Sequence, residues 1–308
     1  MEQDKKLSLT HSDIQPTDMT RLCRRLVQCP GLLKLDFSHG SLKDDAIENL
    51  LNILPKMTSL QLLNMSHVQM STDGVLLLVR SLIDCQRVRA VELRPQGEAF
   101  IKFVNMKAEQ ATCRLTQYTL SSGDVEKLSG ILEQCPHLSD LDLSSNLLRD
   151  EGVKSFVDSL PRLRIASSVN LNDNRLTQMG ALYLVNTVMT CEKVAAVEVS
   201  LGTEERSVIR FEQDSDCGKT LSLRECHFGA DHLQRLAEIL TRCAAQLVKL
   251  RIRNNGLSVQ VIEDLVKQLR CGHVQRYISI EEPWITAEAA VNLLSCCLNL
   301  NPNIHTIG

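Results

Sequence analysis

Short apolar–polar–apolar motifs recur along this chain at a nearly constant spacing. The second apolar residue of each motif recurs at steps of 28 or 29 positions, apart from two shorter steps of 22 and 24. The series runs Leu9, Phe37, Met65, Leu93, Leu115, Leu143, Leu171, Val199, Leu223, Ile252 and Ile280. The alternation predicts short strands whose apolar side chains point into a core. A fixed period of this length is typical of a leucine-rich-repeat solenoid.

Each strand motif is followed by the pattern of an amphipathic helix. Ile47, Leu50, Leu51 and Leu54 hold the i, i+3, i+4 and i+7 positions of one helical face. Between strand and helix we expect an asparagine whose side chain binds the backbone of a bend, the candidates being Asn146, Asn174 and Asn254. The fold class predicted is α/β: a horseshoe with a parallel β-sheet on its concave face and helices on its convex face.

Two repeats are too short to hold a helix. They lie near 88–112 and 194–220, and they divide the chain into blocks that begin at Leu9, Leu115 and Leu223. Within the second short repeat, Ile209-Arg210-Phe211 alternates apolar and charged residues as a strand does. We expect each short repeat to replace its helix with an extended segment on the convex side.

Length and charge limit the class of protein further. The repeats predict one domain over residues 1–308, with about 11 repeats and an aliphatic core, since aromatic residues make up only 3% of the chain. The net charge of −3 argues against direct nucleic-acid binding. The N-terminus lacks a secretory signal, and no apolar run spans a bilayer. Repeats reach both ends without a polar cap, so we expect a fragment or isoform of a longer array.

The twelve cysteines follow the repeat and not a metal-site spacing. Cys29, Cys85, Cys135, Cys191 and Cys243 each stand 20 residues after a strand residue, where a small buried side chain can close a helix. We expect reduced thiols of an intracellular protein. Zinc binding by Cys217, Cys226 and His227, or by Cys271 and His273, is less favoured than a structural role.

No catalytic or cofactor-binding constellation is evident, so we expect no enzyme, no cofactor and no metal. Gly218-Lys219-Thr220 resembles the end of a phosphate-binding loop, but the motif needs glycine where Gln213 stands. It also needs a helix afterwards, whereas a strand follows. Nucleotide binding is therefore not expected here.

Residues beside the second apolar position of each strand point outward and form the predicted partner-binding surface. The candidates are Asp142, Asn170, Asn172, Arg224, Arg251 and Arg253. The three arginines form a basic patch suited to an acidic or phosphorylated protein segment. The competing interpretation is a solvated strand face on which Glu225 balances Arg224. Trp284, the single tryptophan, either fills the last groove or anchors a partner.

The unit length, the N-x-L turn and the Cys-Pro helix ends resemble the ribonuclease-inhibitor class of leucine-rich repeats. The units Leu141–Leu160 and Val169–Val188, with the interrupted blocks, resemble the C-terminal array of a NOD-like receptor. This resemblance implies a cytosolic innate-immune regulator that enters the nucleus. It also implies regulation of antiviral, NF-κB and interferon signalling and transactivation of MHC class I genes.

Two other functions remain open at this point. An inhibitor of the ribonuclease-inhibitor kind would be expected to carry more negative charge than −3. A GTPase-activating repeat protein would supply groups to a GTPase, but no residues can be named for that role. Repeat scaffolds carry many unrelated functions, so sequence pattern alone does not choose the partner.

Overall fold

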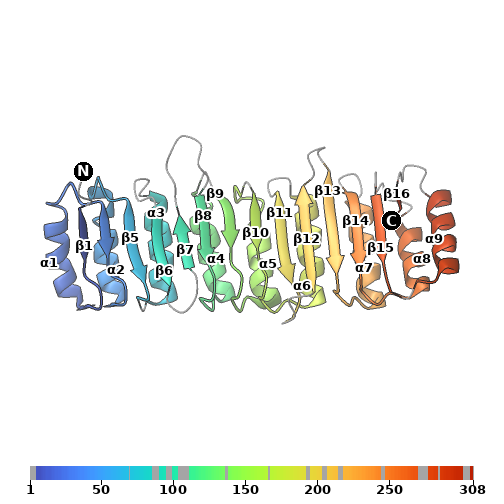
Figure 1. Cartoon of the computed structure of the whole chain (residues 1–308), viewed down its shortest axis with the longest axis horizontal. Helices are drawn as coiled ribbons and strands as arrows, with labels where there is room; N and C mark the ends of the chain where they lie inside the picture. Colours follow the sequence, from blue (N-terminus) through green and yellow to red (C-terminus); the bar gives the residue numbers. More distant parts are fainter. Residues whose placement is uncertain are drawn as a thin grey trace. The chain divides into compact units, whose positions relative to one another are not determined.

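The computed structural model describes residues 5–68, 70–84, 90–94, 99–102, 111–135, 138–165, 167–191, 195–202, 207–213, 218–243, 247–269, 277–283, 285–300 and 306–307. The chain divides into two compact units, whose helices and strands are labelled in Figure 1. The first holds Met1–Asn146 with Arg162–Ala166, and the second holds Leu147–Pro161 with Ser167–Gly308.

The first unit is a sheet covered on one face by helices. Its strands, in spatial order, are β1 (Lys6–Ser8), β3 (Lys34–Asp36), β5 (Leu62–Ser66), β6 (Ala90–Arg94), β7 (Ala99–Lys102), β8 (Ala111–Leu115) and β9 (Leu138–Asp142). The helices are α1 (Pro16–Leu26), α2 (Asp44–Leu51), the 3-10 helix η1 (Leu54–Lys56), α3 (Thr72–Asp84) and α4 (Ser122–Leu132). A small second sheet pairs β2 (Asp13–Ile14) with β4 (Ser41–Leu42).

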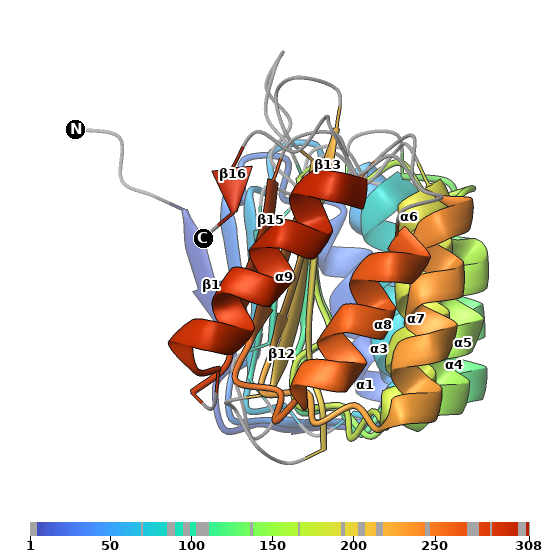
Figure 2. The same cartoon turned by 90° about the vertical axis from the view of Figure 1, so that its right-hand side faces the viewer.

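The second unit has the same two layers, with α7 and α8 beside strands β13 and β15 (Figure 2). Its strands are β10 (Ser168–Asn170), β11 (Ala196–Ser200), β12 (Val208–Gln213), β13 (Lys219–Arg224), β14 (Leu247–Arg253), β15 (Tyr277–Glu281) and β16 (Thr306–Ile307). Its helices are α5 (Arg149–Ser159), α6 (Gln178–Thr190), α7 (Ala230–Arg242), α8 (Val259–Leu269) and α9 (Ala287–Leu300).

The register of the parallel strands confirms the 28-residue period. Leu7 lies beside Leu35, and Leu35 lies beside Leu63, each partner one period along the chain. Leu35 and Leu63 are at most 1% exposed. A fully buried leucine contributes about 1.5–3 kcal/mol through the hydrophobic effect, so these ladders hold consecutive repeats together.

In the described residues of both short repeats an extended segment stands in place of a helix, as predicted, but the predicted position of that segment was wrong. The segments β7 and β12 lie within the main sheet, each antiparallel to both of its neighbours. The physical reason is hydrogen bonding, because a strand between two others satisfies its N–H and C=O groups on both edges. In β12, Ile209 and Phe211 are buried and Arg210 is exposed, so the alternation matches a sheet covered on one face. Residues 95–98 and 103–110 of the first short repeat, and 203–206 and 214–217 of the second, lie outside the described residues.

A buried asparagine follows the strand at the third position after the repeating apolar residue. The side chain of Asn146 donates to the carbonyl oxygens of Leu115, Leu143 and Ser144 and accepts from the amides of Tyr118 and Leu120, at 2.7–3.2 Å. Asn174 occupies the equivalent position in the next repeat.

The expectation for Asn254 was wrong by one residue. Asn255, at the same offset of three from Ile252, holds the buried position and binds the carbonyls of Leu223 and Arg253. Asn254 instead adopts a left-handed backbone conformation with φ of 52°. In the following repeat, Glu282 reaches back and accepts hydrogen bonds from the Asn255 and Gly256 amides.

The helix-end cysteines are buried at three of the four described positions. Cys135, Cys191 and Cys243 are at most 8% exposed, as a side chain that closes a helix should be. Cys29 is exposed, so the expectation was wrong there. Cys85, Cys217 and Cys271, like His273 and Trp284, lie outside the described residues.

Candidate interaction surface

The sheet face away from the helices, here called the open face, carries one continuous row of polar residues across the second unit. Strand register places them side by side from β10 to β15: Asn170, Glu198, Arg210, Ser222, Arg251 and Ser279. Adjacent strands lie about 4.8 Å apart, so neighbours in the row can contact one another or one shared ligand. Ser279 at the end of the row is buried, so the accessible polar surface runs from Asn170 to Arg251.

The arginine patch, defined as Arg224, Arg251 and Arg253, lies on β13 and β14. Arg224 and Arg253 are register partners, and all three side chains are exposed. Arg224 forms an ion pair with Glu225 at 3.4 Å, as the solvated-face interpretation expected, and Arg253 pairs with Glu281 at 3.2 Å. Such exposed pairs stabilise a protein by about 0–1 kcal/mol, so either arginine can exchange its partner at little cost.

Arg251 differs from the other two arginines of the patch. Within the described part of the chain it forms no ion pair, and it lies between Ser222 and Ser279 of the adjacent strands. Ser279 is buried at 4% exposure and Ser222 is partly exposed, so the accessible group is the guanidinium of Arg251, whose donors form a fork that matches a carboxylate or phosphate. Arg251 is therefore the arginine of the patch that can bind an anion without first losing an ion pair to a described residue.

Asp142 and Asn170 are engaged in shaping the ends of their own strands. The Oδ1 atom of Asp142 accepts from the amide of Ser144 at 3.0 Å, and Asn170 does the same for Asn172. Arg114 also lies 3.9 Å from the Asp142 carboxylate. The side chains of Asp36 and Asn64 make the same turn with the residue two positions later, so the arrangement belongs to the repeat. The contacts of Asp142 and Asn170 are therefore structural in the first place.

Asn172 connects instead to a charged cluster that the sequence did not reveal. Its Nδ2 donates to Glu198 at 2.7 Å, and the guanidinium of Arg210 donates to the same carboxylate, with Nε at 2.8 Å. Partial burial raises the pKa of Glu198, but hydrogen bonds from Asn172 and Arg210 and the charge of Arg210 together hold it below the ordinary value. Arg210 was missed as a surface residue because β12 was expected on the helix side.

A ladder of histidines lies in the turns of the first unit and was not anticipated either. His11, His39 and His67 stack on one another, with ring centroids 4.9 and 4.5 Å apart and planes inclined by 12° and 13°. Each has a positive φ of 57–58° and stands two residues after its strand residue. The repeat of histidine at 28-residue spacing was the available signal.

The Gly-Lys-Thr segment has structural roles. A Cβ atom on Gly218 would lie 1.7 Å from Val248 Cγ2, so packing requires glycine there. Lys219 is only 3% exposed and points into the protein, not toward a ligand. Cys226 is buried, and no group of three or more potential metal ligands occurs in the ranges that the structure describes. None of the described helices is long and apolar enough to cross a membrane.

The repeat geometry and the sequence comparisons agree on the class of protein. Residues 134–157 match the family model of the leucine-rich repeat. Together with the 28-residue register of strands and helices, this match shows that the chain belongs to the leucine-rich-repeat proteins.

The relatives place the chain more narrowly. It is 55% identical to Protein NLRC5 of Ictalurus punctatus over 98% of its length, and 33% identical to Protein NLRC5 of Homo sapiens over 99%. It is also 25% identical over 80% of its length to the human NACHT, LRR and PYD domains-containing protein 14 and covers 24% of that protein. The chain is thus a leucine-rich-repeat region of the NOD-like receptor type. It spans 18% and 16% of the two NLRC5 relatives.

Proposed function

We propose that the chain is a non-enzymatic protein-interaction and regulatory module of a NOD-like receptor that acts in innate immunity. Its similarity to NLRC5 over nearly its whole length supports this proposal. The single-domain organisation over residues 1–308 is part of the proposal. Repeat arrays bind partners across extended surfaces, and here the open face supplies the surface.

The observation that carries the binding proposal is that Arg251 forms no ion pair with any residue that the structure describes. Glu225 and Glu281 engage the other two arginines of the patch, while Arg251 lies between the strands that bear Ser222 and Ser279. An acidic or phosphorylated protein segment would bind Arg251 directly and displace the weak neighbouring pairs. Asn170 and Asn172, on the open face of the same unit, would extend this surface, and Asp142 is a separate candidate contact on the first unit.

The patch is tested by recovery of partners from cell lysate with the wild-type chain and with Arg251→Glu/Arg253→Glu. The proposal expects loss of the partners that phosphatase treatment of the lysate also removes, or of partners with acidic segments. Arg21→Glu/Arg24→Glu in α1 introduces the same change of charge on exposed residues and should recover the wild-type set. Identical recovery by the wild type and the patch variant would reject the proposed site.

The finer biological role is part of the same proposal. By its relation to NLRC5, the chain would influence NF-κB and interferon signalling and the transactivation of MHC class I genes, acting in the cytoplasm and the nucleus. Reporter cells that carry an MHC class I promoter would measure this directly. We expect the wild-type chain to alter promoter output and Arg251→Glu/Arg253→Glu to alter it less at equal expression. Equal output with and without the chain would contradict the role.

A further inference from the structure

The second helix-free repeat opens a groove on the helix side of the sheet. Helix α6 follows strand β10, and helix α7 follows strand β13. The two strands that precede these helices are therefore three steps apart in the sheet, with β11 and β12 between them. At about 4.8 Å a step this is roughly 14 Å, whereas packed helices prefer about 8–10 Å between axes. Helices α6 and α7 still contact each other along part of their length. The groove between them has a volume of about 370 Å³.

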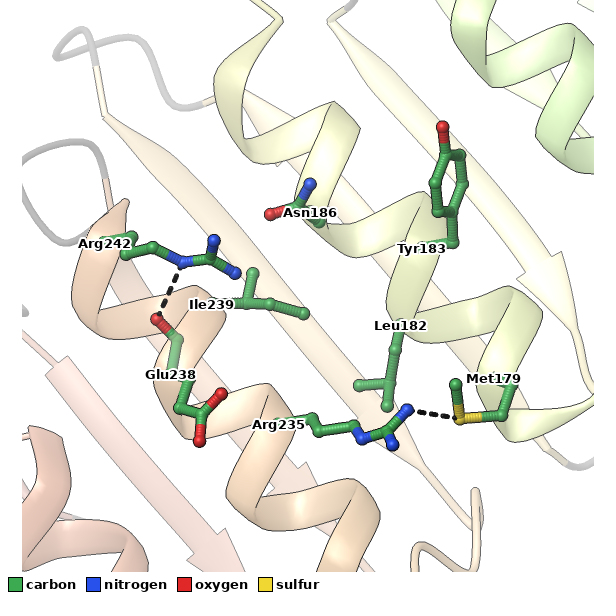
Figure 3. A pocket seen from close by; sticks show the side chains of 8 residues that line it. All are labelled: Met179, Leu182, Tyr183, Asn186, Arg235, Glu238, Ile239 and Arg242. Carbon is green, nitrogen blue, oxygen red and sulfur yellow. Dashed lines mark hydrogen bonds between the residues drawn. The ribbon is translucent and has the colours of Figure 1, made fainter.

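Each wall of the groove is a regular stripe along one helix. On α6 the lining positions are 179, 182, 183 and 186, and on α7 they are 235, 238, 239 and 242. Both series have the spacing i, i+3, i+4, i+7, which is one face of a helix over two turns. Figure 3 shows Leu182 and Ile239 at the centre of the two facing stripes. A groove with two parallel helical walls fits a third helix laid along it.

The α6 wall is chemically unusual for an outward-facing helix. None of the thirteen residues of Gln178–Thr190 is charged, whereas α5 and α7 each carry several charged residues. Met179 is 45% exposed at the rim of the groove, and Tyr183 is half-buried. A helix without charge on any face is typical of one that is covered on all sides.

The first block of repeats shows how the same gap is bridged elsewhere. There, Lys127 of α4 forms an ion pair of 2.8 Å with Asp73 of α3. Arg235 is the position equivalent to Lys127, 108 residues further along the chain, and Met179 is the position equivalent to Asp73, 106 residues further along. Arg235 Nη1 lies 3.3 Å from the sulfur of Met179, as Figure 3 shows. The second block therefore retains the cation and replaces its carboxylate with a thioether.

The charges around the groove favour an acidic occupant. Arg235 and Arg242 both line it, and Arg242 Nε donates to the backbone oxygen of Glu238, at 3.4 Å. Glu238 is the single acidic residue of the lining, so the groove keeps an excess of positive charge. Tyr183 is held at the opposite rim because its hydroxyl donates to Asp158. Arg235 is exposed and forms no ion pair with any residue that the structure describes; its printed contact is the sulfur of Met179.

We propose that the groove between α6 and α7 docks an amphipathic helix of a partner protein, with acidic side chains against Arg235 and Arg242. The apolar face of that helix packs on the exposed Met179, over a floor formed by Leu182 and Ile239, which are 3% and 6% exposed. The incoming carboxylate then takes the place that Asp73 fills in the first block. This surface lies on the helix side of the second unit and is separate from the arginine patch on the open face.

The test uses the full chain and two labelled, stapled peptides of about 15 residues, a length that supports a helix. Both carry leucine at i, i+3, i+4 and i+7; one has glutamates and the other lysines at the flanking positions. Fluorescence anisotropy should show binding of the glutamate peptide at least about tenfold tighter than that of the lysine peptide, since opposite charges across an interface attract.

Matched variants distinguish binding in this groove from binding elsewhere on the chain. Met179→Asp recreates the carboxylate of the first block beside Arg235 and should weaken binding of the glutamate peptide about tenfold, as should Arg235→Glu. Met179 is an exposed rim residue, so the fold is retained and can be checked by circular dichroism. Lys127→Glu, at the equivalent position, and Arg251→Glu/Arg253→Glu should leave the affinity unchanged. Equal binding of the two peptides, binding by neither, or unchanged affinity of Met179→Asp would overturn the proposal.

Discussion

The ammonium group of Lys219 lies 2.7 Å from the carbonyl oxygen of Cys191, directly past the C-terminal end of α6. It also donates to the carbonyls of Val188 and Met189, at 3.1 and 2.7 Å, and lies 5.4 Å from the centroid of the Phe211 ring. The last carbonyls of a helix lack partners within the helix and carry the negative end of its dipole. A buried lysine of the adjacent repeat thus caps the helix.

Lys219→Met should destabilise the second unit by about 2–4 kcal/mol, because the buried carbonyls lose a charged donor and receive none in return. Hydrogen exchange at the end of α6 should quicken more than exchange in α8. Lys56→Met, at an exposed position of η1, is the matched control and should change stability by less than about 0.5 kcal/mol. Unchanged exchange in α6 would show that the cap is dispensable.

Asn146→Ala should cost about 3 kcal/mol or more in unfolding free energy. The substitution removes five hydrogen bonds and leaves the buried carbonyls and amides of two consecutive turns without partners. Chemical denaturation of the two proteins gives the difference. Asn254 was the candidate expected from the sequence, whereas Asn255 holds the buried position. Asn254→Ala should therefore lower the unfolding free energy clearly less than Asn255→Ala. Equal losses for those two would contradict the assignment of the ladder position.

The repeat period predicted the fold because nearly the same spacing of apolar residues recurs from one repeat to the next. Leu35 and Leu63 are in register at one period, and that register requires only their spacing and alternation. The position of β12 could not be predicted in the same way. The alternation in Ile209-Arg210-Phe211 predicts which side chains point to the same face of a strand. It does not predict which neighbouring strands that strand pairs with, here β11 and β13. Arg210 was missed for that reason.

The candidate surface was predicted only in part, for a related reason. Outward-facing positions follow from alternation, and Arg224, Arg251 and Arg253 are exposed as that alternation predicts, while their binding of a partner stays a prediction. The partners of those side chains depend on register across strands, and the ion pair between Arg253 and Glu281 spans 28 residues. The groove between α6 and α7 depends on where a helix is absent, which no single segment encodes.

Glu198 should make the second unit sensitive to acid. Its pKa is held below the ordinary value of about 4.3, so the carboxylate stabilises the fold fully above that value. This stability is lost as pH falls through the folded-state pKa. Glu198→Gln should lower the unfolding free energy at pH 7 by about 0.5–1 kcal/mol, a small effect because Arg210 is half exposed.

The measurement is urea denaturation of Glu198→Gln and wild type at pH 7 and at about pH 3. The difference between them should shrink at the acidic pH, since protonated Glu198 resembles glutamine. Glu126→Gln, an exposed residue of α4, should show a small difference that does not change with pH. A pH-independent loss in Glu198→Gln would point to packing and not to the charge.

Alkylation should divide the described cysteines sharply by burial. Burial raises the pKa of Cys113 to about 12, with a smaller effect of Cys135 and Asp142, and burial likewise raises the pKa of Cys226 to about 12. Only the thiolate reacts, and at pH 8 such a group is ionised in roughly one molecule in ten thousand. With iodoacetamide at pH 8, Cys29 is exposed and should be modified within minutes, while Cys113 and Cys226 stay unmodified until denaturant is added. Mass spectrometry of tryptic peptides measures the modification of each cysteine separately. Rapid labelling of Cys113 in the native chain would contradict the prediction, because it would mean that the first unit opens frequently at β8.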